Sequence, residues 1–142
     1  MKTRSLSSIS LGCVLALALA PPVLAQEKAI SIELNDAANL EGACRLVFVA
    51  VNKTGVVLDK TSYDVITFDT GGKVGQSLAF QFGKLPMGKT KVVKFDLAGQ
   101  SCDGISRLLV NGASECQVGG NASEVCIDAL TTSTRTKIEF GL

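Results

Sequence analysis

The sequence predicts an all-β fold, an immunoglobulin-like or fibronectin-like antiparallel sandwich of about seven strands. Three observations lead to it. Apolar and polar residues alternate with period two in several short segments, turn residues separate these segments about every 8–15 residues, and no segment has the periodicity of a helix of three turns. Short strands at such spacing are typical of two packed sheets.

The first three predicted strands lie in the first half of the domain. Residues 29–35 alternate as a half-buried strand does, and residues 44–52 form a longer valine-rich run, which indicates a central strand. A helix is the alternative for 44–52, but no capping residue precedes it. Residues 61–69 are predicted to place Ile66 and Phe68 inward, with Asp64 among the residues opposite. The inward side chains of the first two strands are predicted to be Ile30, Ile32, Leu34, Leu46, Phe48 and Ala50.

Four more strands are predicted at 76–82, 90–97, 105–110 and 136–140. The first two alternate most regularly, and residues 111–128 are predicted to be the longest irregular stretch of the chain. The inward side chains of these strands are predicted to be Leu78, Phe80, Phe82, Val93, Phe95, Leu97, Ile138 and Phe140. The strands therefore belong to one domain, residues 26–142.

Residues 1–25 have the pattern of a secretory signal peptide. Lys2 and Arg4 precede a ten-residue apolar run at 11–20, and residues 23–25 (VLA) supply a small-residue cleavage site before Gln26. The run is too short for the roughly 20 residues that span a bilayer, and the leader has no paired arginine. We expect a periplasmic or secreted protein that is not stably inserted in a membrane after the leader is removed.

Four cysteines follow the leader, and an even number in an exported chain favours two disulfides. With immunoglobulin-like strand order, Cys44 and the turn that holds Cys102 lie at the same end of the sandwich, and Cys116 and Cys126 share one long loop. We therefore expect the pairs 44–102 and 116–126. A four-thiolate metal site is an alternative, but it lacks a C-x-x-C pair. Free thiols are another, but they require a reducing compartment.

Composition excludes several function classes. The chain has no histidine, which rules out serine and cysteine triads that use one. Beyond residue 25, twelve basic residues balance thirteen acidic ones, so the sequence lacks the basic excess of a nucleic-acid-binding protein. No pattern indicates a metal or cofactor. We expect a non-catalytic envelope module that binds a protein or a polymer through a sheet edge or end loop. A small periplasmic hydrolase is the alternative, and it would need a pocket with convergent groups of shifted pKa.

A few motifs need separate interpretation. Residues 83–90 (GKLPMGKT) match a phosphate-binding loop, but a strand pattern follows where that loop requires a helix, so we interpret them as a turn. Asn52 and Asn121 head glycosylation sequons in predicted loops. Arg107 and Asn121 are the candidate partner contacts; Arg107 also suits a sheet edge or an ion pair. Four carboxylates are assigned to turns or solvated faces: Asp64, Asp69, Asp96 and Asp103.

Four segments carry a resemblance to known proteins: 42–48 (GACRLVF), 68–72 (FDTGG), 82–86 (FGKLP) and 102–111 (CDGISRLLVN). Together they resemble a group of small exported proteins of alphaproteobacteria, usually labelled hypothetical or "Tat pathway signal sequence domain protein". The resemblance implies an envelope location and a shared cysteine framework, and it supplies no catalytic residues. The middle of the chain is also similar to the FxLYD type of small β-sandwich.

Overall fold

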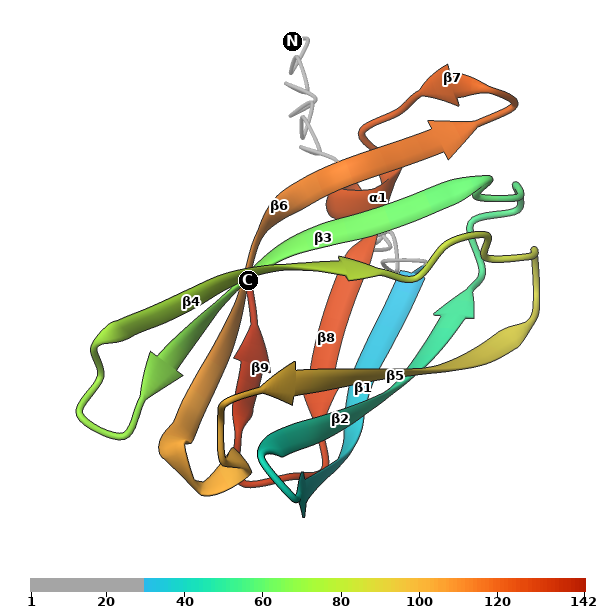
Figure 1. Cartoon of the computed structure of the whole chain (residues 1–142). Coiled ribbons are helices and arrows are strands. Elements are labelled where there is room, and N and C mark those ends of the chain that lie inside the picture. Colours follow the sequence, from blue (N-terminus) through green and yellow to red (C-terminus); the bar gives the residue numbers. More distant parts are fainter. Residues whose placement is uncertain (1–29) are drawn as a thin grey trace, which may run out of the picture.

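A computed structural model describes residues 30–142, which form two packed sheets (Figure 1). The first sheet has the order β5-β2-β1-β8, with β1 Ile30–Leu40, β2 Ala43–Asn52, β5 Thr90–Ala98 and β8 Leu130–Thr134. The second has the order β4-β3-β6-β7, with β3 Lys60–Asp69, β4 Val74–Gln81, β6 Ile105–Val118 and β7 Asn121–Ala122; β9 Glu139–Gly141 also pairs with β6. A 3-10 helix, η1 Cys102–Gly104, and a short helix, α1 Val125–Asp128, connect strands. The predicted signal peptide and its cleavage site lie outside the described residues.

The all-β prediction is confirmed, but the strictly antiparallel arrangement is wrong. β8 runs parallel to β1, and β9 runs parallel to β6. After β6 the chain turns through β7 and α1 and then follows β1 in the same direction. The strand predicted at 136–140 corresponds to β9, and β8 was not predicted. Its sequence, LTTST, has no alternation of apolar and polar residues and forms a strand through its pairing with β1.

The prediction of an irregular stretch at 111–128 is also wrong, because β6 continues to Val118. The second half of β6 pairs with the first half of β3, from Gln117 opposite Lys60 to Gly112 opposite Asp64, with shifts of register between them. The glycine and the polar residues of this segment give a weak strand pattern, and pairing with β3 outweighs it.

The inward face of β3 differs from the prediction as well. Tyr63, Val65 and Thr67 are buried, whereas Ile66 and Phe68 are only partly buried. Asp64 lies on the same side of the strand as these two residues, because side chains alternate with period two. Tyr63 can be buried because its hydroxyl donates a hydrogen bond of 2.8 Å to the Cys126 carbonyl oxygen.

The core is centred on Phe48 of β2. Its ring lies 5.2 Å from that of Phe140 and 5.5 Å from that of Phe80, with tilted or edge-on geometry. The predicted inward faces of β1 and β2 are confirmed, since all six side chains are buried. The segment 83–90 is a turn followed by β5, as expected, and Gly83 and Gly88 adopt positive φ angles of 67° and 69° in it.

The two lateral sides of the sandwich are built differently. On one side, which we call the closed side, β8 and β9 are consecutive strands at the edges of the two sheets, and the chain crosses directly between them. On the other, the open side, β4 and β5 are the edge strands. The loop between β4 and β5 bridges the sheets at one end only, where Leu85 pairs with Leu58. Among residues 30–142, no helix is both long enough and apolar enough to span a bilayer.

Candidate functional site

A shallow groove of about 330 Å³ runs along the open side, and we call it the β4–β5 groove. Four residues of β4 and four of β5 line it: Gln76, Leu78, Ala79, Phe80, Phe95, Asp96, Leu97 and Ala98. Its floor is apolar. The Phe80 and Phe95 rings stack across the two sheets with centroids 4.4 Å apart and planes at 7°. Phe95 and Leu78 are only partly buried, so the groove exposes part of the apolar core.

β4 pairs with β3 along one edge, and its other edge, which faces the groove, has no partner among the described strands. The Gln76 N–H donates to the Thr67 hydroxyl (2.8 Å), and the Phe82 N–H donates to the Thr61 carbonyl oxygen (2.9 Å), so even-numbered residues point toward β3. Because backbone groups alternate along a strand, the N–H and C=O groups of the odd-numbered residues point toward the open side. These are Ser77, Ala79 and Gln81.

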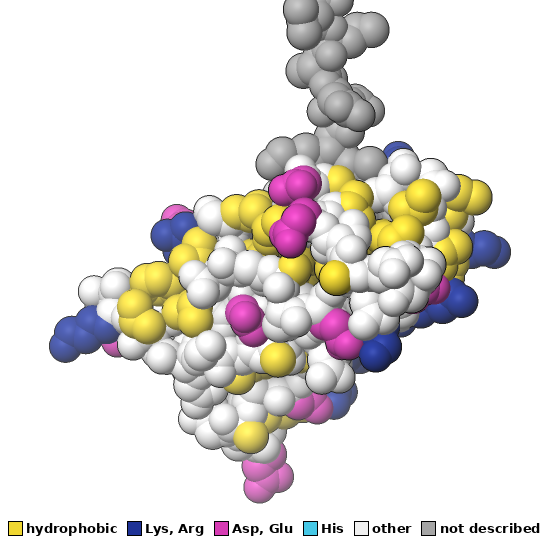
Figure 2. Space-filling view, turned by 90° about the horizontal axis from the view of Figure 1, so that it is seen from above, with side chains coloured by type: hydrophobic (Ala, Val, Ile, Leu, Met, Phe, Trp, Pro, Cys, Tyr) yellow, Lys and Arg dark blue, Asp and Glu magenta, His cyan; other side chains and the backbone are white. Residues whose placement is uncertain are grey.

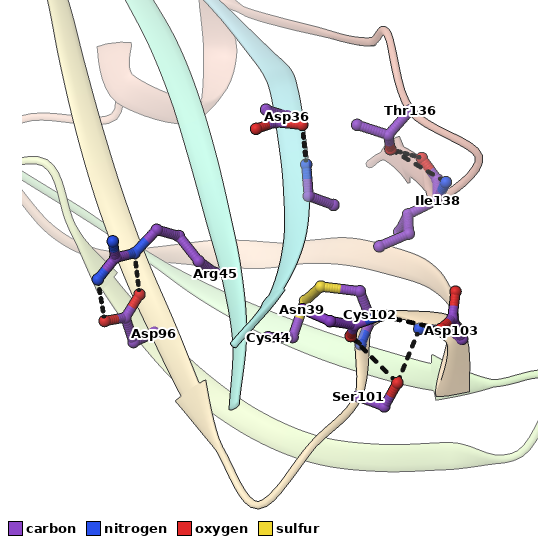
Figure 3. Close-up of a disulfide and its surroundings, with 11 residues drawn as sticks. Asp36, Asn39, Cys44, Arg45, Asp96, Ser101, Cys102, Asp103, Thr136 and Ile138 are labelled. Carbon is purple, nitrogen blue, oxygen red and sulfur yellow. Dashed lines mark hydrogen bonds and ion pairs between the residues drawn. A yellow bond between two sulfur atoms is a disulfide. The ribbon is translucent and has the colours of Figure 1, made fainter. Parts of the chain in front are cut away.

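The facing edge, β5, carries charges. The Gly99 N–H donates to the Gly42 carbonyl oxygen (2.8 Å), which directs the backbone of Lys94 and Asp96 away from β2. Arg45 of β2 holds the Asp96 carboxylate through two hydrogen bonds of 2.7 Å, as Figure 3 shows. These bonds lower the pKa of Asp96 and raise that of Arg45.

The charge of the molecule is divided unevenly around the groove. Residues 73–98, which include both walls, contain five lysines and one aspartate, whereas the rest of the described chain contains six basic and eleven acidic residues. In Figure 2, basic side chains stand at the left and right margins, where Figure 1 places the β3–β4 turn and the loops at the far end of the strands. The segment that forms both walls of the groove is therefore basic, although the one charged residue that lines the groove is Asp96.

The Cys44–Cys102 disulfide, predicted from the strand order, is confirmed and joins β2 to η1 (Figure 3). Asn39 holds the turn beside it: its side-chain oxygen accepts from the Cys102 N–H (2.7 Å), and its nitrogen donates to Asp103 (2.9 Å). A cavity of about 480 Å³ lies next to this bridge. Its polar lining mixes acidic and basic side chains, Asp36, Asp103, Arg135 and Lys137 among them. Asp36 accepts from the Ala37 N–H, and Asp103 accepts from the Asn39 side chain.

The Cys116–Cys126 pairing is also confirmed, but Cys116 lies in β6 and Cys126 in α1 rather than both in one loop. The bridge fixes α1 against β6 at the point where the chain leaves for β8. All four cysteines beyond residue 25 are thus oxidised in pairs, which overturns the alternatives of a four-thiolate metal site and of free thiols.

The two predicted partner contacts, Arg107 and Asn121, do not lie together. The Arg107 guanidinium carbon lies 5.5 Å from the centroid of the Phe68 ring, on the outer face of the second sheet. Asn121 is exposed on β7 and donates to the Gly119 carbonyl oxygen. Asn121 pairs with Val118 at the far end of β6. At about 3.3 Å per residue, Val118 lies roughly 35 Å along the strand from Arg107.

The sequon at Asn52 has a structural role. The side chain is fully buried; it donates to the carbonyl oxygens of Val56 (2.8 Å) and Leu85 (2.9 Å) and accepts from the N–H and hydroxyl of Thr54. Asp69 accepts from the N–H groups of Gly71 and Lys73, as predicted for a turn.

Within residues 30–142, no three side chains of the types that ligate metals come together. The raised pKa of Tyr63 is due to burial, and the lowered pKa of Glu33 is due to hydrogen bonds from Asn35 and Arg135. No family model, curated protein or solved structure matches the chain.

Sequence reasoning assigned the apolar residues of the β4–β5 groove to the core and did not identify the groove. One signal was present: residues 74–83 form an uncharged run flanked by Lys73 and Lys84. Exposed edge strands usually carry charges or proline, so an uncharged edge is unusual.

Proposed function

We propose that this protein is a non-catalytic module of the bacterial envelope that binds a protein partner at the β4–β5 groove. The observation that carries the proposal is the combination of an uncharged strand edge with an exposed apolar floor on the same side of the molecule. Exposed edges and apolar patches of this kind mark interaction surfaces in soluble proteins.

Several observations support an exported module of immunoglobulin-like type. The two disulfides are compatible with an oxidising compartment. The pairing of β2 with β5 and of β3 with β6 follows the immunoglobulin-like order, although the strands of the closed side depart from it. The resemblance to small exported alphaproteobacterial proteins points to the same location, the periplasm or the exterior.

The groove is less suited to the alternative, a small hydrolase. Asp96 is the one carboxylate in its lining, and Arg45 already occupies both of its oxygens. General acid–base catalysis needs a group that is free to exchange a proton with a substrate. The groove instead offers apolar side chains and backbone hydrogen-bonding groups, which are the means by which proteins bind extended chains.

Photocrosslinking in the native envelope tests the proposal. A photoreactive residue is introduced at Ala79, in the groove, and in a matched variant at Ser133, which is exposed on β8 at the closed side. We expect a discrete crosslinked protein from position 79 and none from position 133. Equal labelling at both positions, or no protein crosslinked at position 79, would contradict a binding role for the groove.

A further inference from the structure

We propose that the groove binds an extended polypeptide segment that adds to β4 as a new edge strand, inserts alternate apolar side chains between the sheets, and carries acidic residues at its ends. This inference rests on the proposed function above and specifies the partner chemistry of the same site.

The backbone of β4 supplies the first reason. Ser77, Ala79 and Gln81 present N–H and C=O groups toward the open side, in the alternating pattern that an added strand pairs with. β4 is an edge strand of eight residues with no charge and no proline. The other edges are less suitable, since β5 is charged, and β8 and β9 have five and three residues.

The groove floor supplies the second reason. A strand added to β4 would extend the second sheet, and its inward side chains would lie over Leu78 and Phe95, two partly buried residues. The groove, about 330 Å³ in volume and open to solvent, is at the low end of small-molecule sites, which span roughly 300–1,000 Å³. Its shape and size suit the side chains of an extended peptide better than an enclosed metabolite.

The charges supply the third reason and indicate that the partner strand is acidic at its ends. Lys73 stands at one end of β4 and Lys84 just beyond the other, and both are exposed. The other lysines of residues 73–98 add to this positive charge. Lys91 is the exception, because its ammonium group donates to the carbonyl oxygens of Phe82 (2.6 Å) and Lys84 (3.1 Å). Acidic residues at the ends of the partner strand complement these lysines and steer association.

The same lysines disfavour a second copy of the chain as the occupant. Antiparallel pairing of two β4 strands about Leu78 would bring Lys73 of one copy beside Lys84 of the other, at both ends of the pair. Like charges that flank an aggregation-prone strand act against self-pairing. An acidic partner instead places charges of opposite sign beside both lysines.

A designed peptide tests the inference with the mature, oxidised chain. The probe has valine at three alternating positions, threonine between them and two aspartates at each end; the control peptide has lysines in place of the aspartates. We expect the acidic probe to slow amide exchange at Ser77, Ala79 and Gln81 and to bind at least about tenfold more tightly than the basic control at low salt. This preference should shrink as salt screens the charges.

Matched proline variants locate the binding edge. Ala79→Pro removes an N–H that points toward the open side and leaves the pairing of β4 with β3 intact. Val92→Pro is the matched control: it removes an N–H from the free edge of β5 and leaves the pairing of β5 with β2 intact. We expect Ala79→Pro to weaken probe binding by about tenfold or more, since it removes an edge hydrogen bond and obstructs the incoming strand, and Val92→Pro to leave binding unchanged. Ser77→Pro replaces Ala79→Pro if the latter does not fold.

Four outcomes overturn the inference: no binding of the probe, equal binding of the basic control, amide protection on β5 instead of β4, or concentration-dependent self-association through β4. If any of these occurs while Ala79 still crosslinks a partner in the envelope, the inference fails and the proposed function stands. If Ala79 crosslinks nothing, the proposed function fails whatever the peptide does.

Discussion

The closed and open sides of the sandwich differ in a way that strand length does not explain. β8 and β9 are short, with five and three residues, yet Leu130 of β8, Phe140 of β9 and Ile138, which precedes β9, are buried. β4 and β5 are longer, with eight and nine residues, yet Leu78 and Phe95 remain partly exposed between them. The difference lies in the connections: the chain passes from β8 to β9 through residues 135–138, whereas a longer segment, residues 82–89, separates β4 from β5.

The largest expected effect comes from the bridge that ties β2 to η1, in the connection between the two sheets. Replacing Cys44 and Cys102 by Ser should cost ~4 kcal/mol of unfolding free energy, because the bridge closes a loop with a sequence separation of 58. Urea unfolding without added reductant or oxidant, which leaves the remaining disulfide intact, measures this loss of unfolding free energy. If the Cys116→Ser, Cys126→Ser double variant loses more, the closed side is the main contributor to stability.

The two sides should differ next in their response to cavity creation. Leu130 on the closed side is fully buried, so Leu130→Ala should cost about 2–5 kcal/mol through lost transfer energy and an unfilled cavity. Leu78→Ala on the open side should cost about 1 kcal/mol or less, because solvent already reaches the side chain. Chemical denaturation of the pair gives both values. Equal costs would mean that something covers the open side in solution.

The second disulfide should affect the closed side locally. Its sequence separation is 10, so replacing Cys116 and Cys126 by Ser should cost ~2.5–3 kcal/mol. Because the bridge anchors α1 just before β8, we expect amide exchange to accelerate more in β8 than in β4. Exchange followed by mass spectrometry on both strands checks this, and uniform acceleration would show that the bridge stabilises the whole fold equally.

The sequence predictions were accurate where the two faces of a predicted strand differ in their side chains. Residues 29–35 have one apolar face, and their inward residues were predicted correctly; the inward residues of 44–52 were also predicted correctly, although valines occupy most of the opposite face of that strand. Strand β3 offered two candidate faces, and the buried one depends on the carbonyl group of Cys126, which is distant in sequence from Tyr63. β8 has no alternation and depends on β1. Such long-range pairings are not encoded in any local pattern.

The candidate site was harder to predict for a related reason. Phe80 and Phe95 were correctly expected to point inward, but their position at an open side follows from the order of strands in two sheets. Local alternation does not specify that order. The roles of Arg107 and Asn121 as partner contacts stay predictions, and their separation along β6 means that one partner surface would have to be long to include both.

The smallest expected effect concerns one ion pair on each side. On the first sheet, Arg135 donates to Glu33 (2.8 Å) beside β8, and Arg45 holds Asp96 on β5. Hydrogen bonds from Asn35 and Arg135 lower the pKa of Glu33, and those from Arg45 lower the pKa of Asp96. A carboxylate with a lowered folded-state pKa stabilises the fold above its unfolded pKa, about 4, and loses this contribution as the pH falls through the folded value.

We therefore expect Glu33→Gln and Asp96→Asn to lower the melting temperature slightly at pH 7, and we expect the difference from the unsubstituted protein to shrink as the pH falls below about 4 and through the lowered folded-state pKa of each carboxyl. Calorimetric melts across this range measure the difference, and added salt should reduce it, because both pairs are exposed. The two variants should behave alike, since exposed pairs do not depend on which side of the sandwich is closed. An Asp96→Asn effect that did not shrink as the pH fell below about 4 would have to arise from the packing of β5 rather than from its charge, and the open edge would then be more rigid than its exposure indicates.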